Sequence, residues 1–189
     1  MTIYTYVVVV CWAVFIIYWI ALGLAAKRTV GVASRHMVLR IVTFLILLII
    51  LAMQFSSSMN LLNYRIASAE HPFLAAVGAL LCAIGIVFAI RARSYLGRNW
   101  GMPQAIKESP ELVTSGPYSY VRHPIYTGVI LAMIGTGLVT SLVWLALVIF
   151  YSIYFIHSAY QEEKTMLKVF PETYPPYKAR TKMLIPFIY

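Results

Sequence analysis

Residues 116–128, GPYSYVRHPIYTG, join the two kinds of sequence from which this chain is built. A basic, polar stretch precedes them, and residues 124–161 contain no Asp, Glu, Lys or Arg. The segment itself places Arg122 and His123 where the chain enters the uncharged run. Ionisable side chains at the edge of a membrane span are costly to keep there and usually serve a function. The segment therefore predicts a functional site at a membrane boundary.

The composition of the 189-residue chain is that of a membrane protein. Hydrophobic residues make up 61% of it, charged residues make up 11%, and the mean hydropathy is +0.81. Soluble globular chains are about 45–50% apolar and about 25% charged. A net charge of +9 would suggest nucleic acid in a soluble protein, but basic residues beside apolar spans report topology instead. We predict an all-α, polytopic membrane protein in which residues 1–189 form one domain.

Five apolar stretches are predicted to cross the hydrocarbon core of a bilayer, which is about 30 Å thick. Residues 124–161 would be about 57 Å long as one helix, so the run has to turn back, and Thr140-Ser141 is the predicted turn. The predicted transmembrane helices are residues 6–26, 41–59, 73–90, 124–139 and 142–160. The last two are expected to form a helical hairpin.

The basic residues predict how these spans are oriented. All but one of the 15 Lys and Arg residues lie in the loops after the first, third and fifth spans, and the exception is Arg65. Because basic loops stay on the cytoplasmic side, the N-terminus is expected outside and the C-terminus in the cytoplasm. The predicted cofactor-binding region, residues 91–128 and 160–189, then faces the cytoplasm.

Two polar clusters lie on this same face, one at Arg122-His123 and the other at Glu162-Glu163. The predicted hairpin brings them together, where a water-soluble cofactor can meet a lipid-borne substrate. His123 has three open roles: hydrogen bonding to a ligand, general acid or base catalysis, and packing at the interface. The nearby tyrosines either form an aromatic belt or line a pocket for adenine or a sulfonium cation. The four histidines lack ligand-like spacing, so no metal site is predicted.

The clusters and their surroundings resemble the isoprenylcysteine carboxyl methyltransferase family and the related membrane phospholipid methyltransferases. The resemblance is carried by the order and spacing of several segments across the C-terminal half: RSYLGRNW at 93–100, residues 116–128, Glu162-Glu163, Leu167, Phe170, Tyr174, Tyr177 and the ending Leu184-Ile185-Pro186-Phe187. The first two predicted spans match only as apolar spans.

The resemblance implies S-adenosylmethionine as methyl donor and a lipophilic, membrane-embedded acceptor, such as a carboxylate of the prenylcysteine type. It implies membrane lipids and a lipophilic or lipid-modified substrate as partners, with neither nucleic acid nor metal. The residues that it assigns to the cofactor are Leu112, Val113, Tyr118, His123, Pro124, Tyr126, Glu162 and Glu163.

One feature of the family's substrate site is missing from this chain. Family members hold the substrate carboxylate with an arginine a few residues before the acidic pair, and residues 156–160 contain none. Arg122 is the remaining cation that can orient an anionic acceptor. We therefore predict Arg122 and His123 as the catalytic residues.

Two alternative functions stay open at this point. A membrane sterol-type reductase, which uses a nicotinamide cofactor, has a similar Arg-His-x-x-Tyr-x-Gly stretch and a similar ending. Those reductases carry a basic, Asp-containing segment where this chain has Tyr160-Gln161-Glu162-Glu163. The other alternative is a non-catalytic membrane module. The absence of charged residues within the five predicted spans argues against an ion pathway in such a module.

Overall fold

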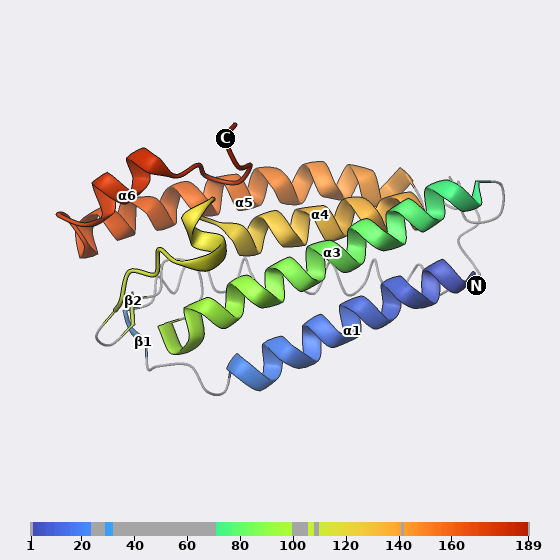
Figure 1. Ribbon diagram of the computed structural model, residues 1–189, viewed down its shortest axis with the longest axis horizontal. Coiled ribbons are helices and arrows are strands. Elements are labelled where there is room, and N and C mark those ends of the chain that lie inside the picture. The colour runs from blue at the N-terminus through green and yellow to red at the C-terminus, as the bar shows by residue number, and fades with distance from the viewer. Residues whose placement is uncertain are drawn as a thin grey trace.

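The computed structural model describes residues 2–23, 29–31, 71–99, 106–107, 110–140 and 142–188. In these ranges the long helices α1 (Ile3–Gly23), α3 (Pro72–Leu96), α4 (Pro124–Val139) and α5 (Leu142–Val169) run side by side along the long axis (Figure 1). The predicted span at residues 41–59 lies outside the described residues. The predicted helical class is thus confirmed for this part of the chain.

Shorter elements lie at one end of the long helices (Figure 1). They are the 3₁₀ turns η1 (Gly97–Asn99) and η2 (Gly116–Ser119), the helix α6 (Tyr174–Arg180), and the strands β1 (Thr29–Gly31) and β2 (Ile106–Lys107). The two strands pair antiparallel and join the chain after α1 to the chain after α3. This small ribbon departs from the predicted purely helical structure.

Helix length and composition agree with membrane spans at two places. Among the described helices, α1 and α3 are long and apolar enough to cross a membrane, and α4 is a shorter apolar helix. The predicted hairpin turn is confirmed, because α4 ends at Val139 and α5 begins at Leu142. Helix α5 continues nine residues beyond the predicted span, since Gln, Glu, Lys and Leu favour a helix until the chain reaches Pro171.

Helices α3 and α4 pack against each other through small residues. A Cβ atom added to Gly85 would lie 2.5 Å from both the backbone nitrogen of Ala132 and the carbonyl oxygen of Gly128. A Cβ atom on Gly128 would lie 2.6 Å from the carbonyl oxygen of Gly85. The two backbones therefore touch, which is how helices associate closely in lipid. Gly85, Gly128 and Ala132 thus form the packing face between α3 and α4.

We expect the Gly85→Ala substitution to destabilise the protein. Alanine favours a helix by about 1 kcal/mol over glycine, but the new methyl group would overlap backbone atoms that cannot move without separating α3 from α4. Overpacking of this kind costs about 1–3 kcal/mol, so the net effect is a loss of stability. Unfolding in detergent micelles measures it. Leu80→Ala is the control, because Leu80 on the same helix is 60% exposed; equal stability of both variants would contradict the prediction.

Candidate functional site

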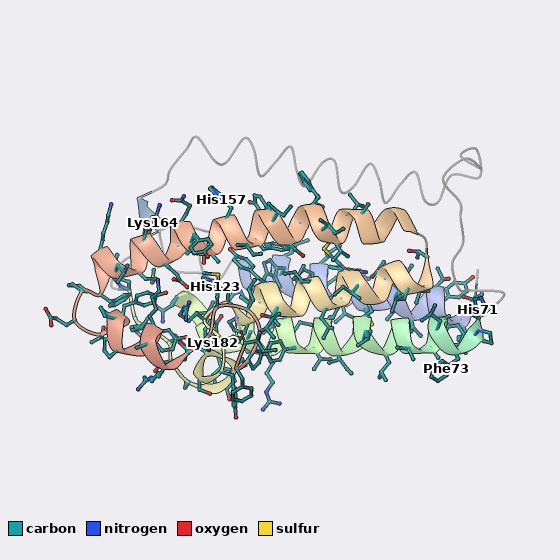
Figure 2. The ribbon with its side chains drawn as sticks, turned by 90° about the horizontal axis from the view of Figure 1, so that it is seen from above. His71, Phe73, His123, His157, Lys164 and Lys182 are labelled. Atoms are coloured by element: carbon teal, nitrogen blue, oxygen red, sulfur yellow. The ribbon has the colours of Figure 1, made fainter. Side chains whose placement is uncertain are left out.

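The polar clusters come together at one end of the helical bundle. In Figure 2, His123, Lys164 and Lys182 lie towards this end, whereas His71 and Phe73 lie at the opposite end. Prolines start both η2 and α4, where a missing backbone N–H and a fixed φ angle suit the first turn of a helix. Gly116 has a φ of +60°, and a side chain there would overlap the ring of Tyr95. These local constraints place His123 directly before α4.

The end of the chain lies along the segment that contains Arg122 and His123. We refer to residues 181–188 as the C-terminal strap. Hydrogen bonds that join it to this segment run from Arg122 N to Lys182 O (2.8 Å), from His123 N to Met183 O (3.1 Å) and from Thr127 Oγ1 to Leu184 O (2.7 Å). Most of these contacts involve the backbone, so the strap fixes the position of Arg122 and His123 whatever the identity of its own side chains.

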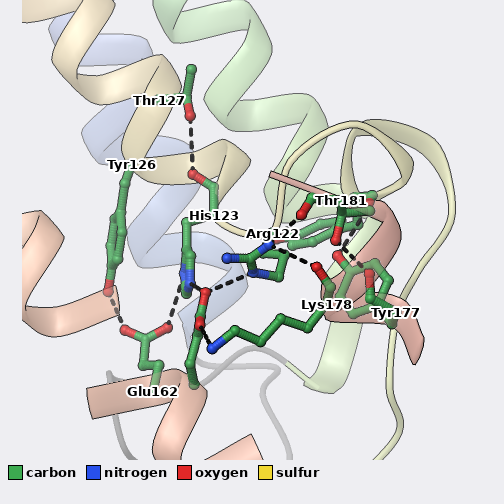
Figure 3. A network of polar contacts seen from close by, with 10 residues as sticks. Arg122, His123, Tyr126, Thr127, Glu162, Tyr177, Lys178 and Thr181 are labelled. Carbon is green, nitrogen blue, oxygen red and sulfur yellow. Dashed lines mark hydrogen bonds and ion pairs between the residues drawn. The ribbon is translucent and has the colours of Figure 1, made fainter. Parts of the chain in front are cut away.

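Glu163 is the centre of a buried ion cluster (Figure 3). Its side chain is 2% exposed, and its Oε1 lies 2.6 Å from Arg122 Nε and 3.5 Å from His123 Nε2. Its Oε2 lies 2.7 Å from Lys178 Nζ. A buried carboxylate is tolerated only when cations and hydrogen bonds compensate for the water it has lost. The cluster thus joins α5, α6 and the start of α4.

The guanidinium of Arg122 makes several hydrogen bonds within the protein. Its Nε donates to Glu163, and its Nη1 donates to the carbonyl oxygens of Thr181 and Lys178, the latter at 3.3 Å. Among the described residues, the structure records no acceptor for Nη2. Arg122 therefore holds α6 and the strap in place and keeps one nitrogen available to a ligand.

Glu162 is held on the other side of His123 (Figure 3). The hydroxyl of Tyr126 donates to Glu162 Oε1, and His123 Nδ1 lies 3.6 Å from Glu162 Oε2. The rings of His123 and Tyr126 are stacked, with centroids 5.5 Å apart, and the ring of Tyr126 stacks on Phe155 at 4.8 Å. The contacts of Tyr126 with α5 thus change from a hydrogen bond at Glu162 to ring stacking at Phe155, in the direction of the apolar part of the helix.

The charges in the cluster set the protonation of its members. Burial alone would lower the pKa of His123, but Glu162 and Glu163 outweigh it and raise this pKa above its usual 6.5. Burial alone would raise the pKa of Glu163, but His123, Lys178 and Arg122 lower it from 4.5 to about 2. The two carboxylates therefore favour the protonated form of His123, which opposes its open role as a general base.

Stability is expected to fall on both sides of a plateau as pH changes. The contribution of Glu163 is complete above pH 4.5 and is lost as pH falls towards about 2, because its pKa is lowered in the folded state. The contribution of His123 is complete below pH 6.5 and is lost as pH rises through its raised pKa. Unfolding midpoints between about pH 3 and about pH 9 test this. His123→Gln should flatten the alkaline side and also move the acid side to higher pH, because His123 helps to lower the pKa of Glu163. An unchanged alkaline side would contradict the assignment.

The structure brings most of the predicted site residues together. Arg122, His123, Tyr126, Glu162 and Glu163 form the connected cluster described above. Of the other predicted residues, Pro124 is buried in the first turn of α4, Tyr118 is buried in η2, and Leu112 and Val113 are partly buried in the stretch before η2. The assignment of these residues to a cofactor stays a prediction.

Lys178 is a member of the cluster that sequence reasoning missed. It lies on α6, where Tyr174 and Tyr177 are buried. A helix places residues three and four positions apart on one face, so Tyr174 marks the face that Lys178 shares. That periodicity is the signal that could have pointed to Lys178. The residue that it reaches, Glu163, could not be identified from the periodicity alone.

No metal centre accompanies the cluster in the part of the chain that the structure describes. Those residues contain no group of three or more His, Cys, Asp or Glu side chains arranged to hold a metal ion.

Comparisons with known proteins find a methyltransferase family, together with relatives named as methyltransferases and as metal-resistance proteins. A family profile described as phospholipid methyltransferase matches residues 73–173. The chain is 32% identical over 123 residues to the protein-S-isoprenylcysteine O-methyltransferase of Tribolium castaneum, covering 63% of this chain and 44% of that protein. It is also 30% identical over 113 residues to a nickel-cobalt-cadmium resistance protein of Alcaligenes xylosoxydans xylosoxydans, covering 58% and 52%. The chain thus spans about half the length of the curated relatives it matches.

A solved structure is similar as well. The eukaryotic intramembrane Ras methyltransferase ICMT (isoprenylcysteine carboxyl methyltransferase) matches with a TM-score of 0.55 and 32% identity, over 62% of this chain and 46% of that one. The family match, at residues 73–173, covers more than half of the chain and includes both Arg122-His123 and Glu162-Glu163. The resemblance noted in the sequence is confirmed, and the chain belongs to the phospholipid methyltransferase family.

Proposed function

We propose that the chain transfers the methyl group of S-adenosylmethionine to a lipophilic acceptor in the membrane, a carboxylate of the prenylcysteine type. The observation that carries the proposal is the ion cluster of Arg122, His123, Glu162 and Glu163 at the end of an apolar helical hairpin. The methyltransferase family, and the isoprenylcysteine methyltransferase among the relatives, support this over a nicotinamide-dependent reductase or a non-catalytic module.

The residues around Tyr126 and Glu162 fit a sulfonium cofactor. An aromatic ring and a carboxylate both attract a cation, and Glu162 is partly exposed, at 24%. His123 Nε2 is buried and has no hydrogen-bond partner of normal geometry among the described residues, so it can donate to a ligand. When bound, S-adenosylmethionine supplies an electrophilic methyl group. Tyr118, Pro124, Leu112 and Val113 would complete the walls of this pocket.

A carboxylate acceptor suits the chemistry of the cluster. A carboxylate is already ionised at neutral pH, so its methylation requires no base. Because Glu162 and Glu163 favour the protonated form of His123, this residue is poorly suited to accept the proton that an amine acceptor would have to lose. Orientation of the acceptor then supplies much of the rate, and we assign it to Arg122 through its available Nη2. His123 would keep the two carboxylates of α5 in position.

The membrane arrangement is part of the proposal. We propose that α1, α3, α4, α5 and a further helix at residues 41–59 span the bilayer, with the site on the cytoplasmic face. Single cysteines that replace His71 and Glu172, which are both exposed, should then react with a membrane-impermeant thiol reagent from opposite sides of the membrane. Labelling of both from one side would contradict this topology.

Ligand binding to the purified protein tests the function. Calorimetry in detergent should detect binding of S-adenosylmethionine and of its demethylated product, but not of the reduced nicotinamide cofactor. Transfer of a labelled methyl group to an S-prenylated N-acetylcysteine should then follow. Binding of the nicotinamide without binding of S-adenosylmethionine would instead support the reductase.

A further inference from the structure

Lys178 differs from the other cations that contact Glu163. Its side chain is 41% exposed, whereas the side chains of Arg122 and His123 are each 9% exposed. Figure 3 shows the Lys178 side chain extending from α6 along the cluster, where its ammonium lies 2.7 Å from Glu163 Oε2. Lys178 therefore lies where the buried cluster meets solvent.

The contacts of Lys178 leave it free to change partner. Its ammonium has three N–H donors, and the one contact recorded for it among the described residues is with Glu163 Oε2, at 2.7 Å. Arg122, in contrast, is fixed by Glu163 and by two backbone carbonyls. If Lys178 turned away, Arg122 and His123 would still compensate the charge of Glu163. The flexible stem of a lysine allows such a movement at little cost.

The charges of the cluster favour an anionic partner for Lys178. Three cationic side chains, Arg122, His123 and Lys178, face two carboxylates, Glu162 and Glu163. When His123 is protonated, the form that Glu162 and Glu163 favour, one positive charge has no counterpart inside the cluster. A carboxylate that entered beside Lys178 would supply the missing negative charge, whereas an amine would add to the excess.

We infer that Lys178 binds the carboxylate of the acceptor and thereby selects anionic over neutral acceptors. This inference rests on the proposed function and names the residue that gives the site its substrate class. Lys178 exchanges Glu163 for the incoming carboxylate, and Arg122 stays in place to orient it. Lys178 is thus a specificity residue, and the methyl transfer itself requires no proton from it.

The test compares two ligands in matched variants. The ligands are an S-prenylated N-acetylcysteine and its carboxamide, which lacks the negative charge. The wild-type protein should bind the carboxylate about tenfold more tightly than the carboxamide. Lys178→Met should reduce this preference to about twofold and raise KM for the carboxylate with little change in kcat. Lys178→Arg should restore most of the preference, and Lys168→Met, an exposed lysine on α5, should keep all of it.

Measuring the binding of S-adenosylmethionine distinguishes a failure of this inference from a failure of the proposed function. Unchanged binding in Lys178→Met shows that the variant is folded, so that its preference for the carboxylate can be interpreted. A variant that keeps the tenfold preference would overturn the inference, and so would one that loses affinity for S-adenosylmethionine alone, because Lys178 would then hold the cofactor. A wild-type protein that binds no S-adenosylmethionine, or that methylates phosphatidylethanolamine alone, would overturn the proposed function itself.

Discussion

Replacement of Glu163 by glutamine is expected to destabilise the protein by about 3–5 kcal/mol, the cost of removing one partner from a buried ion pair. The Glu163 side chain is 2% exposed, and its charge compensates those of Arg122 and His123, which are 9% exposed. Glutamine keeps the shape but leaves Arg122 without a counterion and His123 with Glu162 alone. The contact with Lys178 adds little, because water screens that exposed ammonium. Methyl transfer should be lost together with stability.

Denaturant titration in mixed micelles measures the loss. Glu172→Gln is the matched control, since Glu172 lies exposed in the turn before α6 and should change the free energy of unfolding by less than about 0.5 kcal/mol. The destabilisation of Glu163→Gln should also shrink at low pH, because protonation neutralises Glu163 in the wild-type protein as pH approaches about 2. A loss below about 1 kcal/mol at neutral pH would mean that water reaches the cluster.

Replacement of Arg122 by alanine should abolish turnover, lowering kcat/KM by about 10³-fold, while binding of S-adenosylmethionine stays measurable. Arg122 is a buried cation of the cluster, and its Nη2 has no recorded acceptor among the described residues. Its Nη1 positions α6 and the strap through the carbonyl oxygens of Lys178 and Thr181. The variant therefore loses both the orienting charge and part of the support of the site.

Two companion variants separate these effects. Arg122→Lys keeps the charge but cannot reproduce the three contacts of the guanidinium, so its activity should lie between those of the wild-type and alanine proteins. Arg91→Ala, at an exposed position on α3, should leave turnover unchanged. Normal turnover in Arg122→Ala would exclude Arg122 from catalysis.

The parts of the site that were predictable follow from apolar length and chain connectivity. A run of 38 uncharged residues is too long for one crossing, so it had to fold back near Thr140, and the fold-back brings Glu162-Glu163 towards Arg122-His123. The structure places His123 Nε2 3.5 Å from Glu163 Oε1, as that topology requires. Hydrophobicity alone had already indicated that Arg122-His123 and Glu162-Glu163 lie close together. The family resemblance added methyl transfer as the chemistry of that site.

The parts that were not predictable depend on contacts between distant segments. The C-terminal strap pairs mainly through backbone atoms, which leave no mark on the choice of side chains. Lys178 reaches Glu163 only because the turn after α5 reverses the direction of the chain at Pro171. The ribbon of β1 and β2 is too short to give an alternating pattern. Long-range geometry, rather than local propensity, decided each of these features.

Helix α5 is continuous from its apolar half to its acidic pair. This continuity links the distance between Phe155 and Tyr126 to the distance between Glu162 and Tyr126. Phe155 and Glu162 are seven residues apart, which is two helical turns, and both contact Tyr126 from the same side. A rigid rod cannot shift one of them sideways without shifting the other. A lipid chain wide enough to push Phe155 outward would also pull Glu162 away from Tyr126. The width of a chain bound beside Phe155 in the bilayer would therefore control the hydrogen bond between Tyr126 and Glu162 at the membrane surface.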